Sequence, residues 1–386
     1  MAPGRPLRLE HGRARIWLGP CILILLYGMP AAAGDVPPVP PAPRASEKPW
    51  PSAAELRERR LASEGLALFQ SADPLPFTLR ADFKQVNKDR DRTRRQKFPG
   101  VLTVVAADGQ PRSIPVTLRT RGKFRLNPRS CAFVPLHVEF PKEGLKGTPF
   151  RGQENLKLVT HCQNEGVHEQ YLLREYLAYR VLNVLTPRSF RARLAQASYV
   201  DSVSGKTVVT RPALLLESEK DVARRLEGRM SEVKARLFRH LDAESLALMM
   251  MFEYMIGNTD FSIHTLHNVR VVKDAAGVLY PVPYDFDHSG LVNAHYAIPS
   301  PRLRIASVVE RLYRGPCRSA PEVEAVLVRF RAAEKAVMDL FDAVPGLDKT
   351  HRRQAKRYLE EFYSTAGRPG SVKTLFVEGC RKDAGM

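Results

Sequence analysis

A run of strand-like segments over residues 100–217, followed by helical segments, most constrains the fold of this chain. GVLTVVA and SIPVTLRTRG flank Asp108-Gly109, and this arrangement predicts a β-hairpin. CAFVPLHVEF and GQENLKLVTHC add strands, and a second predicted hairpin turns at Ser204-Gly205. We therefore expect an α+β protein in which a set of antiparallel strands precedes most of the helices.

Helical spacing dominates the remaining segments. EQYLLREYLAYRVLNVL carries apolar residues at helical intervals and ends before Pro187. AESLALMMMFEYMI follows Asp242, a residue type that caps helices, and its Leu and Met stripe predicts a core helix rather than a cofactor-binding segment. Further helical patterns follow residue 300, and residues 54–70 predict a helix near the N-terminus.

The first 75 residues predict an export signal and a linker. Basic residues precede an apolar run from Ile16 to Met29 that is short for a membrane span, and three alanines follow it. We expect residues 1–34 to be a signal peptide, with an uncleaved anchor as the alternative. Residues 35–75 are expected to form a proline-rich linker and a short helix. The mature protein is then periplasmic or extracellular, without a stable membrane span.

Four cysteines remain after removal of the signal, namely Cys131, Cys162, Cys317 and Cys380. An even number in an exported protein predicts two disulfides, and no pair has the spacing of a zinc or redox site. Three connectivities are possible. The local one, Cys131 with Cys162 and Cys317 with Cys380, would close the two halves of the chain separately.

The net charge of +19 favours anionic partners such as nucleotides, acidic or phosphorylated proteins, and anionic envelope surfaces. No zinc-finger spacing, recognition helix or RNA-binding aromatic motif accompanies this charge. The charge run at residues 88–97 is expected to be a solvated loop. We therefore expect no nucleic-acid partner.

Polar residues within residues 252–290 predict the functional site. Asp260 follows an apolar helix, Asn268 comes eight positions later, and a predicted hairpin leads to Asp285 and Asp287. Phosphoryl transfer from ATP needs an acid at the acceptor hydroxyl and oxygen ligands for Mg²⁺ on the phosphates. Asp260 is the predicted base or hydroxyl-orienting group. Asn268 and Asp285 are predicted ligands of Mg²⁺ or Mn²⁺, with Asp287 as a further carboxylate near the metal.

The same segment resembles the CotH-like family of atypical, secretory-pathway and spore-coat protein kinases. The matching motifs are Asn258-Thr-Asp260, His267-Asn268, Pro283-Tyr-Asp285-Phe-Asp287 and Gly290. The resemblance implies a bilobal, protein-kinase-like α+β fold, with an antiparallel β-rich N-lobe at 76–218 and a mainly helical C-lobe at 219–386. It also implies an enzyme that transfers the γ-phosphoryl group of ATP to a hydroxyl, that of a protein serine or threonine.

The resemblance further implies residues that contact the nucleotide from the N-lobe. Arg121 lies in an R-x-R-G element that is expected over the phosphates. Lys157, in the strand-like NLKLV, is expected to point at the phosphates. Glu175 is the predicted ion-pair partner of Lys157, with Glu169 as the alternative. Glu217, which follows a predicted strand, is expected to contact the nucleotide or a lobe partner.

Two other functions fit parts of the pattern. The first is a catalytically inactive kinase-like protein that binds an envelope component. The second is a metallohydrolase that uses the cluster of His264, His267, Asp285, Asp287 and His288. The metallohydrolase accounts for the histidines, whereas phosphoryl transfer accounts for the order and the spacing of the acidic and amide residues together.

Overall fold

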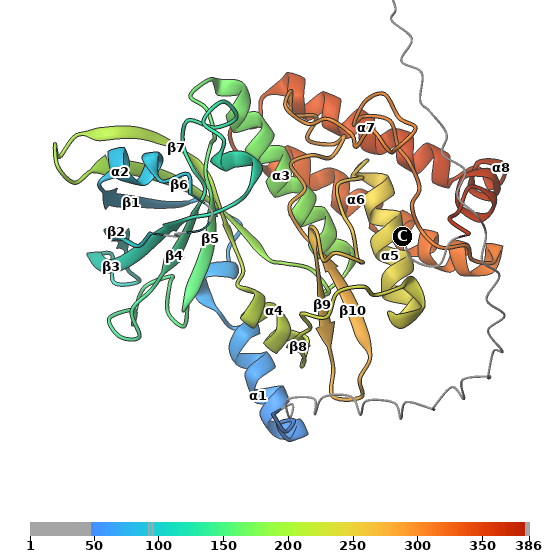
Figure 1. Ribbon diagram of the computed structural model, residues 1–386, viewed down its shortest axis with the longest axis horizontal. Coiled ribbons are helices and arrows are strands. Elements are labelled where there is room, and N and C mark those ends of the chain that lie inside the picture. The colour runs from blue at the N-terminus through green and yellow to red at the C-terminus, as the bar shows by residue number, and fades with distance from the viewer. Residues whose placement is uncertain (1–47, 92, 94–95, 383–386) are drawn as a thin grey trace, which may run out of the picture. The chain divides into compact units, whose positions relative to one another are not determined.

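The computed structural model describes residues 48–91, 93 and 96–382 of the chain (Figure 1). The predicted signal peptide, residues 1–34, lies outside the described residues. The chain from Trp50 onward is a single compact unit. None of the helices in the described ranges is long and apolar enough to cross a membrane.

Seven strands close into a β-barrel in the order β1-β2-β3-β4-β5-β7-β6. The two hairpins predicted within residues 100–217 are present in the barrel, β2 with β3 and β6 with β7. Their turns contain Gly109 at φ +76° and Gly205 at φ +70°, a left-handed conformation that glycine adopts readily. The strands are β1 (Leu75–Ala81), β2 (Phe98–Val105), β3 (Pro111–Thr120), β4 (Leu136–Glu139), β5 (Asn155–Val159), β6 (Ala192–Asp201) and β7 (Thr207–Leu216).

The predicted bilobal, protein-kinase-like fold with a separate helical C-lobe is wrong, because the barrel is closed and the helices pack around it. Strand β1 is the physical reason. Its sequence LPFTLRA alternates buried and exposed residues, and it pairs antiparallel with β2 and parallel with β6. The sheet therefore has no free edge. The predicted strands began at residue 100, so the closing strand was missed.

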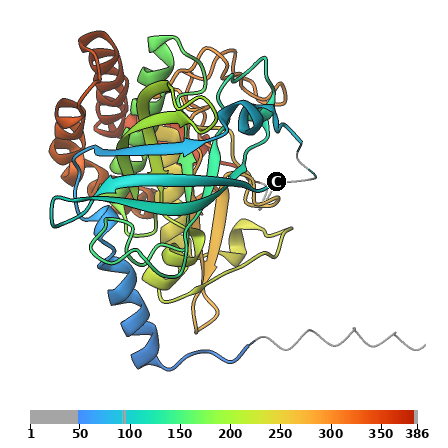
Figure 2. The ribbon, with the colours of Figure 1, turned by 90° about the vertical axis from the view of Figure 1, so that its left-hand side faces the viewer.

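Helices α3, α5, α6 and α7 gather beside the barrel in Figure 1, and Figure 2 looks onto the barrel strands. One continuous hydrophobic cluster joins these helices to the ends of β6 and β7. The helices are α1 (Ala53–Glu64), α2 (Phe83–Lys88), α3 (Gly166–Leu185), α4 (Glu219–Arg225), α5 (Ala243–Met255), α6 (Ala320–Ala343), α7 (Lys349–Ala366) and α8 (Pro369–Val372). Short 3₁₀ turns η1 (Ala67–Phe69), η2 (Phe124–Leu126) and η3 (Phe238–His240) and the π-helical turn η4 (Lys373–Glu378) complete the set.

A second sheet contains β8 (Arg229–Met230), β9 (Val269–Lys273) and β10 (Leu279–Pro283). Strands β9 and β10 form the hairpin that the sequence predicted. The backbone N–H of Tyr284 donates to the carbonyl oxygen of Asn268 at 3.0 Å. The residues that enter and leave this hairpin therefore lie side by side.

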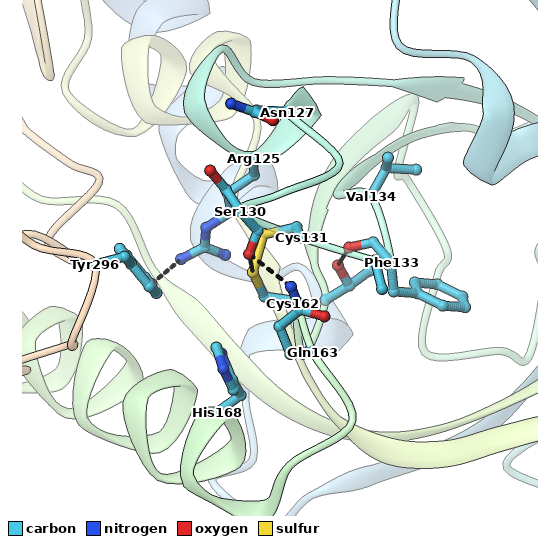
Figure 3. The surroundings of a disulfide bond; sticks show 12 residues. Arg125, Asn127, Ser130, Cys131, Phe133, Val134, Cys162, Gln163, His168 and Tyr296 are labelled. Carbon is cyan, nitrogen blue, oxygen red and sulfur yellow. Dashed lines mark hydrogen bonds between the residues drawn. A yellow bond between two sulfur atoms is a disulfide. The ribbon is translucent and has the colours of Figure 1, made fainter.

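Two disulfides join Cys131 to Cys162 and Cys317 to Cys380, with Cα–Cα distances of 4.6 and 4.8 Å. This is the local pairing of the three that the sequence allows. The first disulfide ties the segment after η2 to the segment that leads into α3 (Figure 3). The second ties the start of α6 to the C-terminal turn η4.

Candidate active site

A cavity with a volume of about 800 Å³ brings together most of the residues that the sequence predicted. Its walls come from the barrel strands, from the loop around η2 and from the β9–β10 hairpin. A small-molecule site typically occupies about 300–1,000 Å³, so a nucleotide fits this space. Glu175 and Glu217 do not line it. The predicted residues that do are Arg121, Lys157, Asp260, Asn268, Asp285 and Asp287.

Asp260 lies in the turn after α5, where Gly257 at φ +65° reverses the chain. The Asn258 side-chain oxygen accepts from the backbone N–H of Asp260 at 3.0 Å. His267 Nε2 lies 3.0 Å from Asp260 Oδ1, and the side chain of Asp260 is 42% exposed. Partial burial raises the pKa of Asp260, but the hydrogen bond and charge of His267 outweigh it, so the net shift is downward. The carboxylate is therefore ionised and fixed, with one side open to the cavity.

Asn268 is buried and holds Asp260 from the other side. Its Nδ2 donates to the carbonyl oxygen of Asp260 at 2.8 Å and to Oδ2 at 3.1 Å. Its backbone has φ +51°, in the left-handed region that non-glycine residues seldom occupy. The Asn268 Oδ1 atom accepts no hydrogen bond from any residue within the described ranges.

Asp285 follows β10 and also has a left-handed backbone, at φ +66°. The Tyr179 hydroxyl accepts from the Asp285 backbone N–H at 2.8 Å and helps to hold this conformation, which costs about 1–3 kcal/mol. Within the described part of the chain the Asp285 carboxylate has no hydrogen bond and no ion pair. Burial and the negative charge of Asp287 raise its pKa.

Arg125 links Asp287 to Glu175. The Arg125 Nη2 atom lies 2.9 Å from Asp287 Oδ2 and 3.1 Å from Glu175 Oε2, and the Tyr296 hydroxyl donates to Asp287 at 3.2 Å. Figure 3 shows Arg125 passing the Cys131–Cys162 disulfide toward Tyr296. Burial raises the pKa of Glu175 to about 8, whereas Arg125 holds the pKa of Asp287 low against the effect of burial. Arg125 therefore bridges the two buried carboxylates.

The predicted ion pair between Lys157 and Glu175 is wrong. Lys157 Nζ lies 2.8 Å from Glu219 Oε1, and Glu175 pairs with Arg125. The strand register explains the difference, because Lys157 on β5 lies opposite Leu216 on β7. Glu219 follows Leu216 by three residues, at the start of α4, and so reaches the lysine first.

Lys157 is fixed in the cavity wall by charge and by aromatic rings. Its Nζ lies 4.6 Å from the centroid of the Tyr284 ring and 5.5 Å from that of Phe190. Arg270 Nε lies 3.0 Å from the same Glu219 oxygen. Burial alone would raise the pKa of Glu219, but Lys157 and Arg270 lower it to about 2.

Glu217 has a structural environment that the sequence did not reveal. It is fully buried outside the cavity and binds Arg191 and Arg225, at 2.7 and 3.0 Å. The Arg191 guanidinium also donates to the carbonyl oxygens of Ser63 and Glu64 at the C-terminal end of α1. Glu217 thus ties the barrel to α1 and α4, and it is a packing carboxylate instead of a nucleotide contact.

Arg121 directly follows β3, is half-buried and lines the cavity, and its predicted place over the phosphates stays a prediction. Its guanidinium has no ion pair or hydrogen bond with another residue in the described ranges. It is close enough to Asp285 to lower the pKa of that carboxyl and to Lys157 to lower the pKa of the lysine. Arg121 is therefore a cation in the cavity wall without a partner of its own.

The histidines do not form the metal centre that a metallohydrolase would need. No group of three or more His, Cys, Asp or Glu side chains in the described ranges could hold a metal ion. His267 binds Asp260, and His288 packs edge-on against Phe124 with ring centroids 5.4 Å apart. Asp285 and Asn268 instead present a carboxylate and an amide oxygen, hard ligands that suit Mg²⁺ when phosphate oxygens complete its shell.

Sequence reasoning missed three residues that shape the site, Arg125, Glu219 and Tyr179. Arg125 lies four positions beyond Arg121 in a segment with several basic residues. The sequence gives no sign of which of these basic side chains is buried. Glu219 begins α4, and Tyr179 lies on a helix rich in apolar residues, so neither has a local signal. Contacts between segments far apart in the sequence bring Arg125 and Glu219 to the cavity wall and the Tyr179 hydroxyl to the Asp285 backbone.

Comparison with known proteins adds no relative, since no family model and no curated protein matches the chain. The resemblance of the segment 252–290 to CotH-like kinases therefore stays a prediction.

Proposed function

We propose that the protein is an exported enzyme that transfers the γ-phosphoryl group of ATP to a hydroxyl, with Mg²⁺ or Mn²⁺ on the phosphates. The acceptor is a serine or threonine of a protein. Two disulfides support a compartment outside the reducing cytoplasm. The proposal rests on the residues of the cavity and not on the fold, because the kinase-like fold that the resemblance implied is absent.

The observation that carries the proposal is a pair of oxygen ligands beside the β9–β10 hairpin that have no partner among the residues that the structure describes. The Asp285 carboxylate and the Asn268 amide oxygen line the cavity, and both residues have left-handed backbones. Asp285 is partly buried, and a carboxylate that loses part of its hydration is normally paired, because desolvation is costly. Backbone strain concentrates at functional sites. A cation that carries phosphate oxygens would account for both features.

Positive charge for the phosphates comes from the barrel side of the cavity. Arg121 has no ion-pair partner in the described part of the chain, and Lys157 is held in place by Glu219 and by two aromatic rings. Bound Mg²⁺ would neutralise charge that develops on the phosphate oxygens, and Asp285 and Asn268 would hold it. The side chains of Arg121 and Lys157 therefore lie in the same cavity as the predicted metal ligands.

In this proposal, Asp260 is the residue that contacts the acceptor hydroxyl. Its low pKa makes it a weak base, so its main role is to orient the acceptor hydroxyl and to receive the proton late in the transfer. The acceptor oxygen forms a bond to the γ-phosphorus as the bond between that phosphorus and the β,γ-bridging oxygen breaks. ADP leaves with the electron pair of the broken bond, and the hydroxyl proton passes to Asp260.

A protein that binds the nucleotide without transfer is the second candidate. The Arg125–Asp287 ion pair favours this candidate, because Arg125 engages the carboxylate of Asp287, the second acidic residue of the predicted metal site. The two candidates share the nucleotide site and differ only in turnover.

Titration calorimetry with ATP and Mg²⁺ tests the site that both candidates share. Asp285→Ala is expected to weaken binding by more than about 100-fold, and Asp287→Ala by less, because Arg125 already engages Asp287. Asp339→Ala, at an exposed carboxylate on α6, is the matched control and should bind as wild type does. Undiminished binding by both site variants would contradict the proposed function.

A further inference from the structure

One guanidinium group binds the backbone carbonyl oxygens of the two residues that flank Asp260. Arg314 Nη1 lies 2.6 Å from the carbonyl oxygen of Thr259 and 3.0 Å from that of Phe261. The Arg314 guanidinium carbon also lies 4.7 Å from the centroid of the Phe261 ring. Two carbonyls fixed by one planar donor restrict the backbone dihedral angles of the residue between them.

The buried floor of this turn contains two further polar residues, Glu253 and Asn258, which are 2% and 1% exposed. The backbone N–H of Asn258 donates to the Glu253 carbonyl oxygen at 2.8 Å, and the Asn258 side chain accepts from the Asp260 N–H. Burial raises the pKa of Glu253 to about 8, while Asn258 and Arg314 act in the opposite direction. Arg314 therefore adds positive charge near the buried Glu253 carboxyl.

The segment that carries Arg314 is itself fixed to the C-terminus. The backbone N–H of Arg381 donates to the carbonyl oxygen of Gly315 at 2.9 Å, and the Cys317–Cys380 disulfide follows immediately. The Tyr313 ring packs against Phe376 of η4 with centroids 5.1 Å apart. The C-terminal turn thus holds the residue whose side chain clamps the Asp260 turn.

We infer that Arg314 is a positioning residue for Asp260, and that the Cys317–Cys380 disulfide maintains its position. The inference rests on the proposed function, because Arg314 acts through Asp260 and does not line the cavity. Both carbonyls accept from the Nη1 atom, so a lysine ammonium can replace these hydrogen bonds in part, but it lacks the planar guanidinium that packs over the Phe261 ring. A displacement of about 1 Å at a reacting group costs about 100-fold in rate.

Steady-state kinetics of phosphoryl transfer tests this inference with Arg314→Met and Arg314→Lys. Arg314→Met is expected to lower kcat by about 10- to 100-fold and to leave the KM for ATP within about 2-fold of wild type. Arg314→Lys should restore part of the lost kcat. Arg193 likewise donates to two backbone carbonyls, those of Leu68 and Ser71, but lies away from the cavity. Arg193→Met is therefore the matched control, with lower stability and an unchanged kcat per folded molecule.

Hydrogen exchange of the backbone amides over residues 257–261 gives a readout that does not need activity. Arg314→Met should speed exchange of the Asp260 amide, and Arg193→Met should not. Reduction of the Cys317–Cys380 disulfide should produce the same local effect to a smaller degree. Unchanged kcat in Arg314→Met, or unchanged exchange at Asp260, would overturn the inference. Absence of transfer by the wild type would instead refute the proposed function, and the exchange data would still decide the role of Arg314.

Discussion

Replacement of Glu217 by alanine should destabilise the protein without weakening its affinity for nucleotide. The Glu217 carboxylate is fully buried and accepts from the backbone N–H of Arg191 at 2.9 Å. It also accepts from the guanidinium groups of Arg191 and Arg225, at distances of 2.7–3.2 Å. These two arginine side chains are only 17% and 8% exposed. The variant would leave both positive charges buried without their carboxylate.

Loss of one partner from a buried ion pair costs about 3–5 kcal/mol of unfolding free energy. With an m-value of about 3 kcal/mol/M, the urea midpoint should fall by about 1–1.7 M. Asp342→Ala provides the control, because Asp342 forms an exposed ion pair with Lys356 at 2.7 Å. Such a surface pair contributes less than about 1 kcal/mol.

Urea unfolding followed by circular dichroism, with calorimetry of ATP and Mg²⁺ on the folded variant, separates the two roles of Glu217. The structure predicts a large loss of stability and an unchanged Kd for nucleotide. A midpoint within about 0.2 M of wild type would refute the structural reasoning. So would a clear loss of nucleotide affinity by a variant whose stability is unchanged.

The disulfides and the Asp260–His267 pair give two more predictions. Replacement of both cysteines in either disulfide should lower the unfolding free energy by about 4 kcal/mol on the chain-entropy estimate, measured by urea unfolding. Free thiols at all four positions in denatured, non-reduced protein would contradict the pairing. Asp260 raises the pKa of His267 above 6.5, so protonated His267 stabilises the native state at low pH, and this gain is lost as pH rises through that pKa. His267→Ala should therefore lower the unfolding free energy by up to about 1 kcal/mol at pH ~5, since the pair is half exposed. At pH ~9 it should leave the unfolding free energy unchanged. An equal effect at both pH values would contradict the assignment.

The local elements of the fold could be predicted from the sequence. Alternation of apolar and polar residues on either side of Asp108-Gly109 and Ser204-Gly205 placed two hairpins of the barrel. Asp242 was predicted to cap α5, and its side chain accepts from the Ser245 N–H at 2.9 Å. These features depend on residues that are near each other in the chain, and local sequence patterns can therefore predict them.

The closure of the barrel could not be predicted in this way. Strand β1 pairs with β6, more than 100 residues away, and no local pattern encodes that contact. The same limit applies to side-chain partners. Lys157 forms an ion pair with Glu219, and Glu175 forms one with Arg125. Strand register and barrel closure determine which opposite charges meet.

The segment of residues 252–290, which carries the predicted site, could be predicted in part. Asp260, Asn268 and Asp285 are close in sequence and are joined by one hairpin, so their convergence on one cavity could be foreseen from their spacing. Arg121 and Lys157 reach that cavity from the barrel, and their placement rested on a resemblance alone. Asn and Asp are among the non-glycine residues that most often adopt a left-handed backbone, but residue type alone did not single out positions 268 and 285.

Phosphate transfer from labelled ATP by the wild type and by Asp260→Asn tests the central claim most directly. Acceptors are the protein itself, generic acceptor proteins and envelope extracts, with Mg²⁺ or Mn²⁺. Asp260→Asn keeps the size of the side chain, so ATP affinity should stay within about 2-fold while transfer falls by about 10²- to 10⁴-fold. Transfer that survives the substitution would contradict the role of Asp260. Absence of transfer by the wild type, despite tight nucleotide binding, would contradict the enzyme and leave a nucleotide-binding protein.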